Sequence, residues 1–378
     1  MFYKNARIYA SDCRFHHGAF EVTDDGRFGQ ILPDYMPEDA YDLEGALVIP
    51  GLVDVHTHGN SGYDFSDGDY EGLKQMARCY LASGVTSFAP ASMTQTYEVL
   101  EKAYATARRM VEEDPTGCAK LRGIHMEGPY FSFKKRGAQN PEHLKNPDLE
   151  GFRKLNEISG DLIRIVDVAP ELPGALEFIR QVSRVATVSV AHTDATYEQA
   201  KAAFGAGASH LTHTFNGMNA IDHRTPGIIP AAAEAPHVRA ELICDGYHVH
   251  PAVIRLAFSM FGSERMILVS DTGRCAGMPE GSKFELGGQD AWLRNGVARL
   301  ADGTIACSAA NLYGCMVKAM EFGIPEEDAV RAASYNPACA IAADKEVGSI
   351  EEGKVADFLV CSADYATKRV FLGGVELK

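Results

Sequence analysis

Between residues 51 and 271, short apolar runs alternate with amphipathic segments. The continuous apolar runs indicate strands that are buried on both faces, and the segments between them indicate helices that pack on one side. This alternation predicts a parallel sheet whose strands are joined by crossover helices. Eight strands are expected, at residues 52–57, 85–90, 121–127, 163–170, 187–193, 210–215, 239–245 and 266–271.

Helices are expected in the intervals between these strands. The segments with helical spacing are residues 70–83, 96–113, 174–184, 196–204 and 251–261. Two more helices are expected after the last strand, at roughly residues 309–322 and 325–334. Gly84 and Gly262 follow two of them directly, as is usual at a helix C-terminus. Eight strand–helix units are the number that closes a barrel, so the predicted fold is α/β, a (β/α)8 TIM-like barrel.

The two ends of the chain differ from this repeating part. Residues 1–50 and 345–378 alternate apolar and polar positions over short runs that Gly and Asp turns interrupt. We expect both ends to form one small β-sandwich domain, which leaves residues 51–344 as the catalytic barrel. A β-rich insertion is expected near residues 283–305, where Ala301-Asp302-Gly303-Thr304 is a hairpin signal.

Composition narrows the list of partners. The net charge of −15 disfavours a nucleic acid or an anionic membrane, because phosphate-rich surfaces attract basic proteins. No apolar run reaches the length of a membrane span and the first residues lack a secretory pattern, so a cytoplasmic location is expected. The nine cysteines include no Cys-x-x-Cys pair, which favours reduced packing residues over disulfides or a zinc knuckle.

His56 and His58 are the most informative chemical signal. They end the apolar run that follows Pro50-Gly51, and Gly59 begins the turn after them. Alternate residues of a strand project from the same face, so the two imidazoles lie about 7 Å apart on one side. A His-x-His pair alone is as consistent with structural histidines in the core or on the surface as with a metal site. The position of this pair at the end of a strand favours a metal site.

Other predicted strands also end in side chains that bind metals. Catalytic residues of a β/α barrel gather at the carboxyl ends of its strands. Besides the histidine pair, those ends carry Glu127, His192, His213 and Asp271. This donor set suits a divalent cation with an open position for water, zinc first and iron, manganese or cobalt as alternatives. A bridging carboxylate allows one or two ions per subunit.

Each of these residues also has a structural interpretation. Glu127 would cap the next loop, His192 would shape a strand-to-helix turn, and Asp271 would form a buried turn. Burying the Asp271 carboxylate is costly without a cation or proton partner, so we favour its use as general base and then general acid toward an activated water. His125 lies deeper in the barrel and His210 faces the other way, so both are expected to be structural.

Five segments together resemble the N-acetylglucosamine-6-phosphate deacetylases of the amidohydrolase superfamily. They are residues 50–59, His125-Met126-Glu127-Gly128-Pro129, residues 191–196, residues 212–218 and Asp245-Gly246-Tyr247-His248. The resemblance spans nearly the whole chain, and residues 348–357 resemble the closing β segment of many amidohydrolases.

The resemblance implies a metal-dependent enzyme of amino-sugar catabolism that removes acetate from N-acetylglucosamine 6-phosphate. It implies that Glu127, His192 and His213 hold the principal ion and that Asp271 is the acid/base residue. His56 and His58 are both present, so a second ion is expected to be possible. The resemblance also implies a homodimer and a small-molecule phosphorylated substrate.

Substrate contacts transfer by resemblance as well. Arg224, which can come from the neighbouring subunit, and His248 would meet the phosphate and supply positive charge in an acidic protein. The remaining contacts would be Ala138, Gln139, Asn216, Gly217, Ile305, Ala306 and Cys307. Two positions depart from the family pattern. Gln139 replaces a histidine that is thought to polarise the amide carbonyl in some members, and Cys307 replaces a more usual glycine and is expected to narrow the pocket.

Three alternative functions stay open. The closest is N-acetylgalactosamine-6-phosphate deacetylation, because the sequence does not separate the two sugar epimers. A cyclic amidase is disfavoured, because residues 163–170 contain no lysine to carry a bridging carbamate. A non-catalytic scaffold on the same fold is also disfavoured, because every expected ligand is present.

Overall fold

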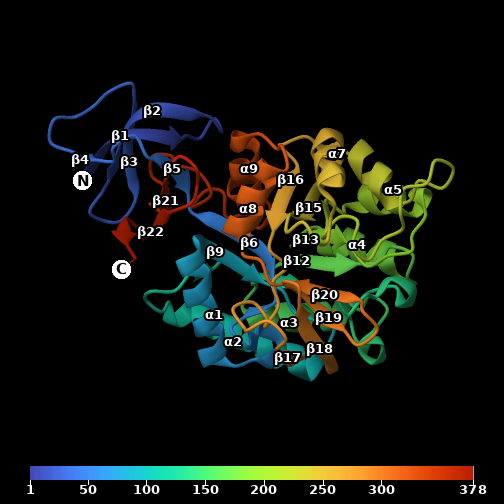
Figure 1. The fold of residues 1–378 in the computed structure, drawn as a ribbon. Coiled ribbons are helices and arrows are strands. Elements are labelled where there is room, and N and C mark those ends of the chain that lie inside the picture. The colour runs from blue at the N-terminus through green and yellow to red at the C-terminus, as the bar shows by residue number, and fades with distance from the viewer. Residues whose placement is uncertain (378) are drawn as a thin grey trace.

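The computed structural model describes residues 1–377 of the chain. Its central part consists of two parallel sheets (Figure 1). The smaller contains β6 (Leu52–Thr57), β9 (Val85–Pro90) and β10 (Lys120–Leu121). The larger contains β11 (Ile124–Met126), β12 (Ile163–Val168), β13 (Thr187–Val190), β14 (His210–Leu211), β15 (Arg239–Ile243) and β16 (Met266–Val269). The predicted α/β class and the parallel pairing are confirmed.

Backbone contacts join the two parallel sheets at both edges. On one side, Ala91 forms a parallel bridge with His125. On the other side, the Asp271 N–H donates to the His56 carbonyl at 2.9 Å, and the His58 N–H donates to the Thr272 carbonyl at 2.7 Å. The segments that follow β6, β9, β11 and β16 therefore meet at one end of the sheets.

Helices cover the parallel strands (Figure 1). Seven lie between strands of the parallel sheets, namely α1 (Tyr70–Ser83), α2 (Tyr97–Glu113), α3 (Leu149–Ser159), α4 (Ala175–Val182), α5 (Tyr197–Ala206), α6 (Ile228–Glu234) and α7 (Pro251–Phe261). Three follow later, namely α8 (Leu312–Glu321), α9 (Glu326–Ala333) and α10 (Tyr335–Ala340). Three short 3-10 helices are η1 (Phe65–Asp67), η2 (Phe133–Lys135) and η3 (Pro141–His143). The sequence pattern did not predict α3, α6 or α10.

Both ends of the chain contribute to one separate sheet, seen at the left of Figure 1. Its strands are β1 (Phe2–Tyr9), β2 (Phe15–Val22), β3 (Phe28–Pro33), β4 (Tyr41–Asp42), β5 (Leu47–Pro50), β21 (Phe358–Cys361), β22 (Lys368–Leu372) and β23 (Val375–Glu376). Strand β5 is central, pairing with β1 in parallel and with β21 antiparallel. Aromatic rings fill its core, and the Phe358 and Phe371 rings stack with centroids 4.3 Å apart. We refer to these strands as the terminal sheet.

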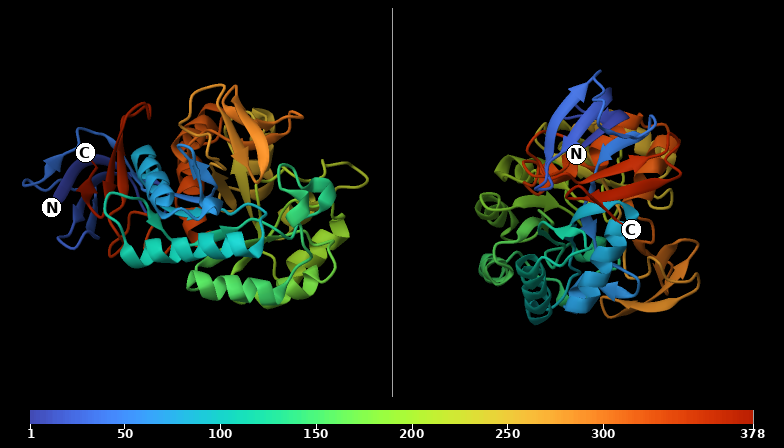
Figure 2. Two further views of the ribbon diagram at one scale, coloured as in Figure 1. Left: turned by 90° about the horizontal axis from the view of Figure 1, so that it is seen from below. Right: turned by 90° about the vertical axis from the view of Figure 1, so that its left-hand side faces the viewer.

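A four-stranded antiparallel sheet follows β16. It contains β17 (Lys283–Leu286), β18 (Gln289–Arg294), β19 (Val297–Leu300) and β20 (Ile305–Ser308), and we refer to it as the inserted sheet. It lies apart from the terminal sheet in both views of Figure 2. A small hairpin of β7 (Gly59–Asn60) and β8 (Tyr63–Asp64) follows β6.

Among residues 1–377, no helix combines the length and apolar character that a membrane span requires.

Candidate metal centre

Three of the predicted ligands converge to form a first triad. Oε1 of Glu127 lies 3.2 Å from Nε2 of His192 and 3.2 Å from Nε2 of His213. The two imidazole nitrogens lie 3.0 Å apart. All three residues are buried, and they come from the segments after β11, β13 and β14.

A second triad lies beside the first. Nε2 of His58 is 3.3 Å from Oδ1 of Asp271, and Nε2 of His56 is 3.7 Å from the same oxygen. Glu127 connects the two groups, because its Oε2 lies 3.3 Å from Nε2 of His58 while its Oε1 faces the first triad. The structure therefore brings together all six residues that the sequence placed at the strand ends.

Five of these six side chains come from residues just beyond a strand end, whereas His56 lies within β6. Strands β13, β14 and β16 end two residues before His192, His213 and Asp271. Each of these residues has a positive φ, of 43°, 30° and 48° respectively. Non-glycine residues adopt this conformation at a cost and do so mostly where function requires it. The sequence prediction that these strands extend through the ligands was wrong, because the backbone turns sharply before each one.

Hydrogen bonds from the Nδ1 atoms of two of the imidazole rings hold these rings in position. Nδ1 of His192 lies 2.8 Å from the Lys135 carbonyl, and Nδ1 of His58 lies 3.1 Å from the Ala91 carbonyl. A carbonyl only accepts, so both Nδ1 atoms carry a proton and Nε2 is the nitrogen of each ring that can ligate an ion. Gly217 packs so closely on the His192 ring that a Cβ there would lie 2.7 Å from Nδ1. The rings are thus fixed with their ligating nitrogens facing the cluster.

The electrostatics of the cluster favour a cation. Burial raises the pKa of Glu127, but His58, His192 and His213 outweigh it and hold that pKa well below its usual range. Burial lowers the pKa of His213, but Glu127 raises it to about 9. The pKa of His58 is likewise raised to about 9, where Glu127 and Asp271 outweigh burial. The buried carboxylates therefore need positive charge close to them.

The donor set fits a divalent metal ion. A tetrahedral site with ligands at about 2.0 Å has neighbouring donors about 3.3 Å apart, close to the spacing in the first triad. Nε2 of His56 is buried with no hydrogen-bond partner among the described residues, although it faces the second triad. A buried imidazole nitrogen without a partner is costly unless an ion uses its lone pair.

Gln139 adopts an arrangement that the sequence did not indicate. Its Nε2 donates to Oε2 of Glu127 at 2.8 Å, and its Oε1 accepts from the Thr94 N–H at 2.7 Å. Both ends of the buried amide are therefore in use. Ala138 precedes it and is also buried, with its carbonyl accepting from the Gln289 side chain of the inserted sheet at 2.7 Å.

The two predicted phosphate ligands differ in their surroundings: His248 is held by a carboxylate, whereas Arg224 is exposed. Nδ1 of His248 is 2.6 Å from a carboxylate oxygen of Asp245, directly after β15. Arg224 is exposed in a loop, where it lines a cavity of about 420 Å³ together with Asp194 and Asn219. Asn216 is half-buried and donates to the His213 carbonyl at 3.2 Å.

Strand β20 carries the remaining predicted contacts, Ile305, Ala306 and Cys307. The first two are partly exposed, whereas the Cys307 side chain is buried, with its Sγ 4.0 Å from Sγ of Cys275. A Cβ on Gly273 would lie 2.1 Å from this sulfur. The thiol therefore packs against the loop after Asp271, in the core of the inserted sheet. Whether Cys307 narrows the substrate pocket stays a prediction.

Sequence reasoning missed Glu241, a fully buried residue of β15. Its Oε2 lies 2.9 Å from Nδ1 of His56 and accepts from the His213 N–H at 3.1 Å. A single glutamate beside the apolar run Leu242-Ile243 was the available signal, because an unpaired charge is rarely buried.

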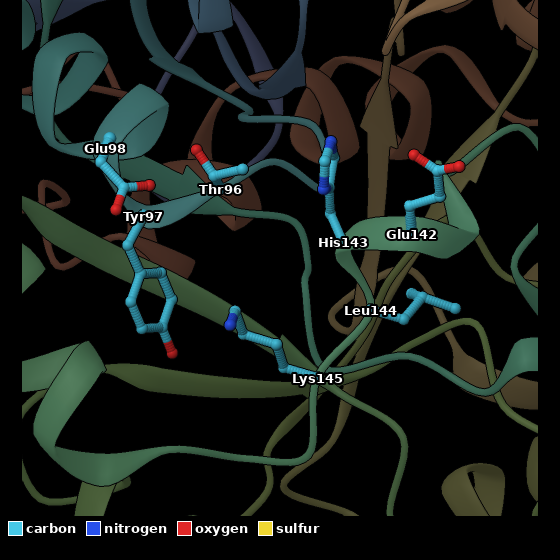
Figure 3. A pocket seen from close by; sticks show the side chains of 7 residues that line it. All are labelled: Thr96, Tyr97, Glu98, Glu142, His143, Leu144 and Lys145. Carbon is cyan, nitrogen blue, oxygen red and sulfur yellow. The ribbon is translucent and has the colours of Figure 1, made fainter.

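A separate pocket of about 280 Å³ is lined in part by residues that follow Gln139 in the chain. Figure 3 shows its lining, which comes from the start of α2 and from Glu142 to Lys145. The Lys145 ammonium lies 5.0 Å from the centre of the Tyr97 ring. None of the six residues of the two triads lines this pocket.

The chain is similar to known proteins over most of its length. The model of the amidohydrolase family matches residues 47–377. The chain belongs to the amidohydrolase family. It is therefore a hydrolase that acts on an amide. A relative from Vibrio furnissii, N-acetylglucosamine-6-phosphate deacetylase, is 34% identical over 92% of this chain and 85% of its own length.

Two further relatives bear on the substrate. N-acetylgalactosamine-6-phosphate deacetylase from Escherichia coli O157:H7 is 31% identical over 93% of this chain and 92% of its own length. The solved structure of a mutant N-acetyl-D-glucosamine-6-phosphate deacetylase from Mycobacterium smegmatis, in complex with N-acetyl-D-glucosamine-6-phosphate, has a TM-score of 0.93. It is 32% identical and covers 100% of this chain and 98% of its own.

Proposed function

We propose that this chain hydrolyses N-acetylglucosamine 6-phosphate to glucosamine 6-phosphate and acetate. The observation that carries the proposal is the pair of triads joined by Glu127, found in a chain whose relatives bear this activity in their names. Metal-dependent hydrolases bind their ion through imidazoles and carboxylates and leave one coordination position for water or substrate. The substrate makes this a reaction of amino-sugar breakdown.

We also propose that the parallel strands close into a barrel and that the two ends of the chain form a small domain. The contacts at both edges of the parallel sheets support a closed (β/α)8 barrel of residues 51–344 with the inserted sheet attached. Residues 1–50 and 345–378 then form a small β-sandwich domain. Active sites of such barrels lie at the carboxyl ends of the strands, where the two triads lie.

The metal is proposed to be zinc. Glu127, His192 and His213 would hold one ion, and His56 and His58 would hold a second one. When bound, a divalent cation polarises the acetamide carbonyl and acidifies water at the site. Asp271 accepts the proton of the attacking water and returns it to the departing amine. Gln139 donates a hydrogen bond beside the reacting carbonyl and keeps the Glu127 carboxylate in place.

The phosphate is proposed to bind between His248 and Arg224. His248 is held by Asp245, which positions its ring. Arg224 is exposed, which supports a role across the interface of a homodimer. Asn216, Gly217, Ala138 and strand β20 would then contact the sugar and its acetyl group. We place the protein in the cytoplasm, where sugar phosphates are found.

Acetate release from a panel of phosphorylated and unphosphorylated N-acetylhexosamines tests the function. The zinc-loaded protein should release acetate from N-acetylglucosamine 6-phosphate far faster than from the free sugar. A variant with Arg224→Ala should raise KM for the phosphorylated sugar without the same effect on the free sugar. Acetate release from the unphosphorylated sugars alone would overturn the phosphate roles.

N-acetylgalactosamine 6-phosphate is the second candidate substrate. A relative whose name states this activity aligns with 93% of the chain. The two sugars differ only in the configuration at C4. The ratio of their kcat/KM values in the same assay separates the candidates.

A further inference from the structure

Glu241 contacts one residue of each triad, namely His56 and His213. Its side chain is fully buried, as is that of His56, and their atoms Oε2 and Nδ1 are 2.9 Å apart. The same oxygen accepts the His213 N–H at 3.1 Å. The other oxygen lies 2.9 Å from Nε2 of His210, a residue of neither triad.

The contact with His56 determines which nitrogen of that ring can ligate. A carboxylate accepts hydrogen bonds, so Nδ1 of His56 carries the proton and Nε2 keeps its lone pair. Nε2 faces the second triad, 3.7 Å from Oδ1 of Asp271, and has no hydrogen-bond partner among the described residues. Carboxylates that orient ligating histidines commonly change metal affinity by about 10–100-fold.

We propose that Glu241 is a positioning residue that sets the tautomer and orientation of His56 and thereby makes the second metal position usable. This inference deepens the proposed function and rests on its metal centre. The neighbouring His125 ring is not free to accept the Nδ1–H of His56 in place of Glu241. His125 lies 3.8 Å from its Oε1 and is already engaged with the Val55 carbonyl and Asp167.

Glu241→Met is the decisive variant, because methionine has a similar size and offers no strong acceptor to Nδ1 of His56. Asp167→Leu is its matched control. Asp167 is equally buried in strand β12 of the same sheet, but its Oδ1 contacts His125 and Thr212 rather than a ligand.

Zinc stoichiometry and affinity are measured on metal-free protein by competition with a chelating dye and by elemental analysis. We expect two zinc equivalents in the wild-type protein and in Asp167→Leu. In Glu241→Met, the affinity for the second equivalent should fall by about 10–100-fold while the first is retained. Equal binding of both ions in Glu241→Met, loss of both ions together, or the same loss in the control would overturn the proposal.

Glu241→Gln gives a second measurement if the methionine variant does not fold. The amide keeps one oxygen for His56 and His213, but it is a weaker acceptor than a carboxylate. The Nδ1–H proton of His56 in imidazole NMR spectra of the zinc-loaded protein should therefore move upfield. An unchanged His56 signal would show that Glu241 does not hold that ring.

These measurements need no substrate. A protein that binds two zinc ions but releases no acetate from any amino-sugar phosphate contradicts the proposed function and leaves the role of Glu241 intact. A protein that deacetylates with one ion per chain contradicts the role of Glu241 and leaves the function intact.

Discussion

Individual residues at the metal centre were easier to predict than their conformations. His56 and His58 were visible because they end a continuous apolar run. Glu241 was missed because its partners come from other strands and are far away in the chain. The positive φ values of His192 and His213 could not be predicted from the sequence pattern either, because residues other than glycine adopt that backbone conformation only rarely.

Substitution of Asp271 by asparagine should abolish proton transfer while preserving the shape of the site. We expect kcat for N-acetylglucosamine 6-phosphate to fall by about 10²–10⁴-fold, with substrate still bound. Steady-state kinetics and a binding measurement check this result. Zinc content is measured in parallel, because Asp271 lies 3.3 Å from His58. A near-normal rate in fully loaded Asp271→Asn would contradict its catalytic role.

Gly273 and Cys307 should be energetically coupled. A Cβ at Gly273 would lie 2.1 Å from the Cys307 sulfur, so Gly273→Ala overpacks this contact. We expect it to lower the free energy of unfolding by about 1–3 kcal/mol. In a Cys307→Gly background most of that cost should vanish. Urea unfolding of the four proteins measures the coupling, and additive effects would contradict it.

At the scale of elements, strands and helices with continuous patterns agree with the prediction. The bounds of β6, β9, α1 and α7 are those expected from the sequence. Strand β14 is shorter than expected, because the backbone turns away at His213. Helix α3 was missed because Gly151 and Pro147 weaken its signal. Gly151 is needed there, since a Cβ would lie 2.5 Å from the Tyr97 ring.

The N-terminus of α3 should depend on Asp148. Its Oδ1 accepts the N–H groups of Glu150 and Gly151 at 3.1 Å each, and its Oδ2 accepts the Tyr97 hydroxyl at 3.0 Å. Asp148→Ala should therefore lower the free energy of unfolding by about 1–2 kcal/mol. Asp148→Asn keeps a capping oxygen and should lose clearly less. Urea unfolding compares the two, and equal losses would contradict a capping role.

At the scale of the molecule, Asp357 should make stability depend on pH. It lies beside the terminal sheet, and burial raises its pKa from 3.8 to about 6, although the Gly373 N–H and Arg122 oppose that change. The folded protein therefore binds this proton more tightly than the unfolded chain does. Its contribution to stability is fully present below pH 4 and is lost as the pH rises to about 6.

Asp357→Asn removes this titration and retains an oxygen for the Gly373 N–H, 2.8 Å away in the wild-type protein. The variant should gain stability relative to the wild type between pH 4 and 6, by about 1.4 kcal/mol for each pH unit within that interval. Urea unfolding at several pH values measures this difference, in which effects common to both proteins cancel. Parallel stability curves for the two proteins would contradict the raised pKa.

Metal removal should also act on the whole molecule. The ligands come from β6 and from the segments after β6, β11, β13, β14 and β16. An ion that they share therefore stabilises the folded chain and not the unfolded one. At zinc concentrations about 100 times Kd the gain is about 2.7 kcal/mol. Calorimetry should show a higher Tm after zinc is added to chelator-treated protein. His192→Asn should respond much less, and an equal response would show that zinc binds elsewhere.

The terminal sheet has a consequence for synthesis on the ribosome. Strand β5 leaves the exit tunnel long before one of its two neighbours, β21. Until β21 has been made, β5 presents an open row of backbone amide and carbonyl groups along that edge. A truncated product that lacks β21–β23 therefore exposes an unpaired strand edge, which favours pairing with other chains and aggregation.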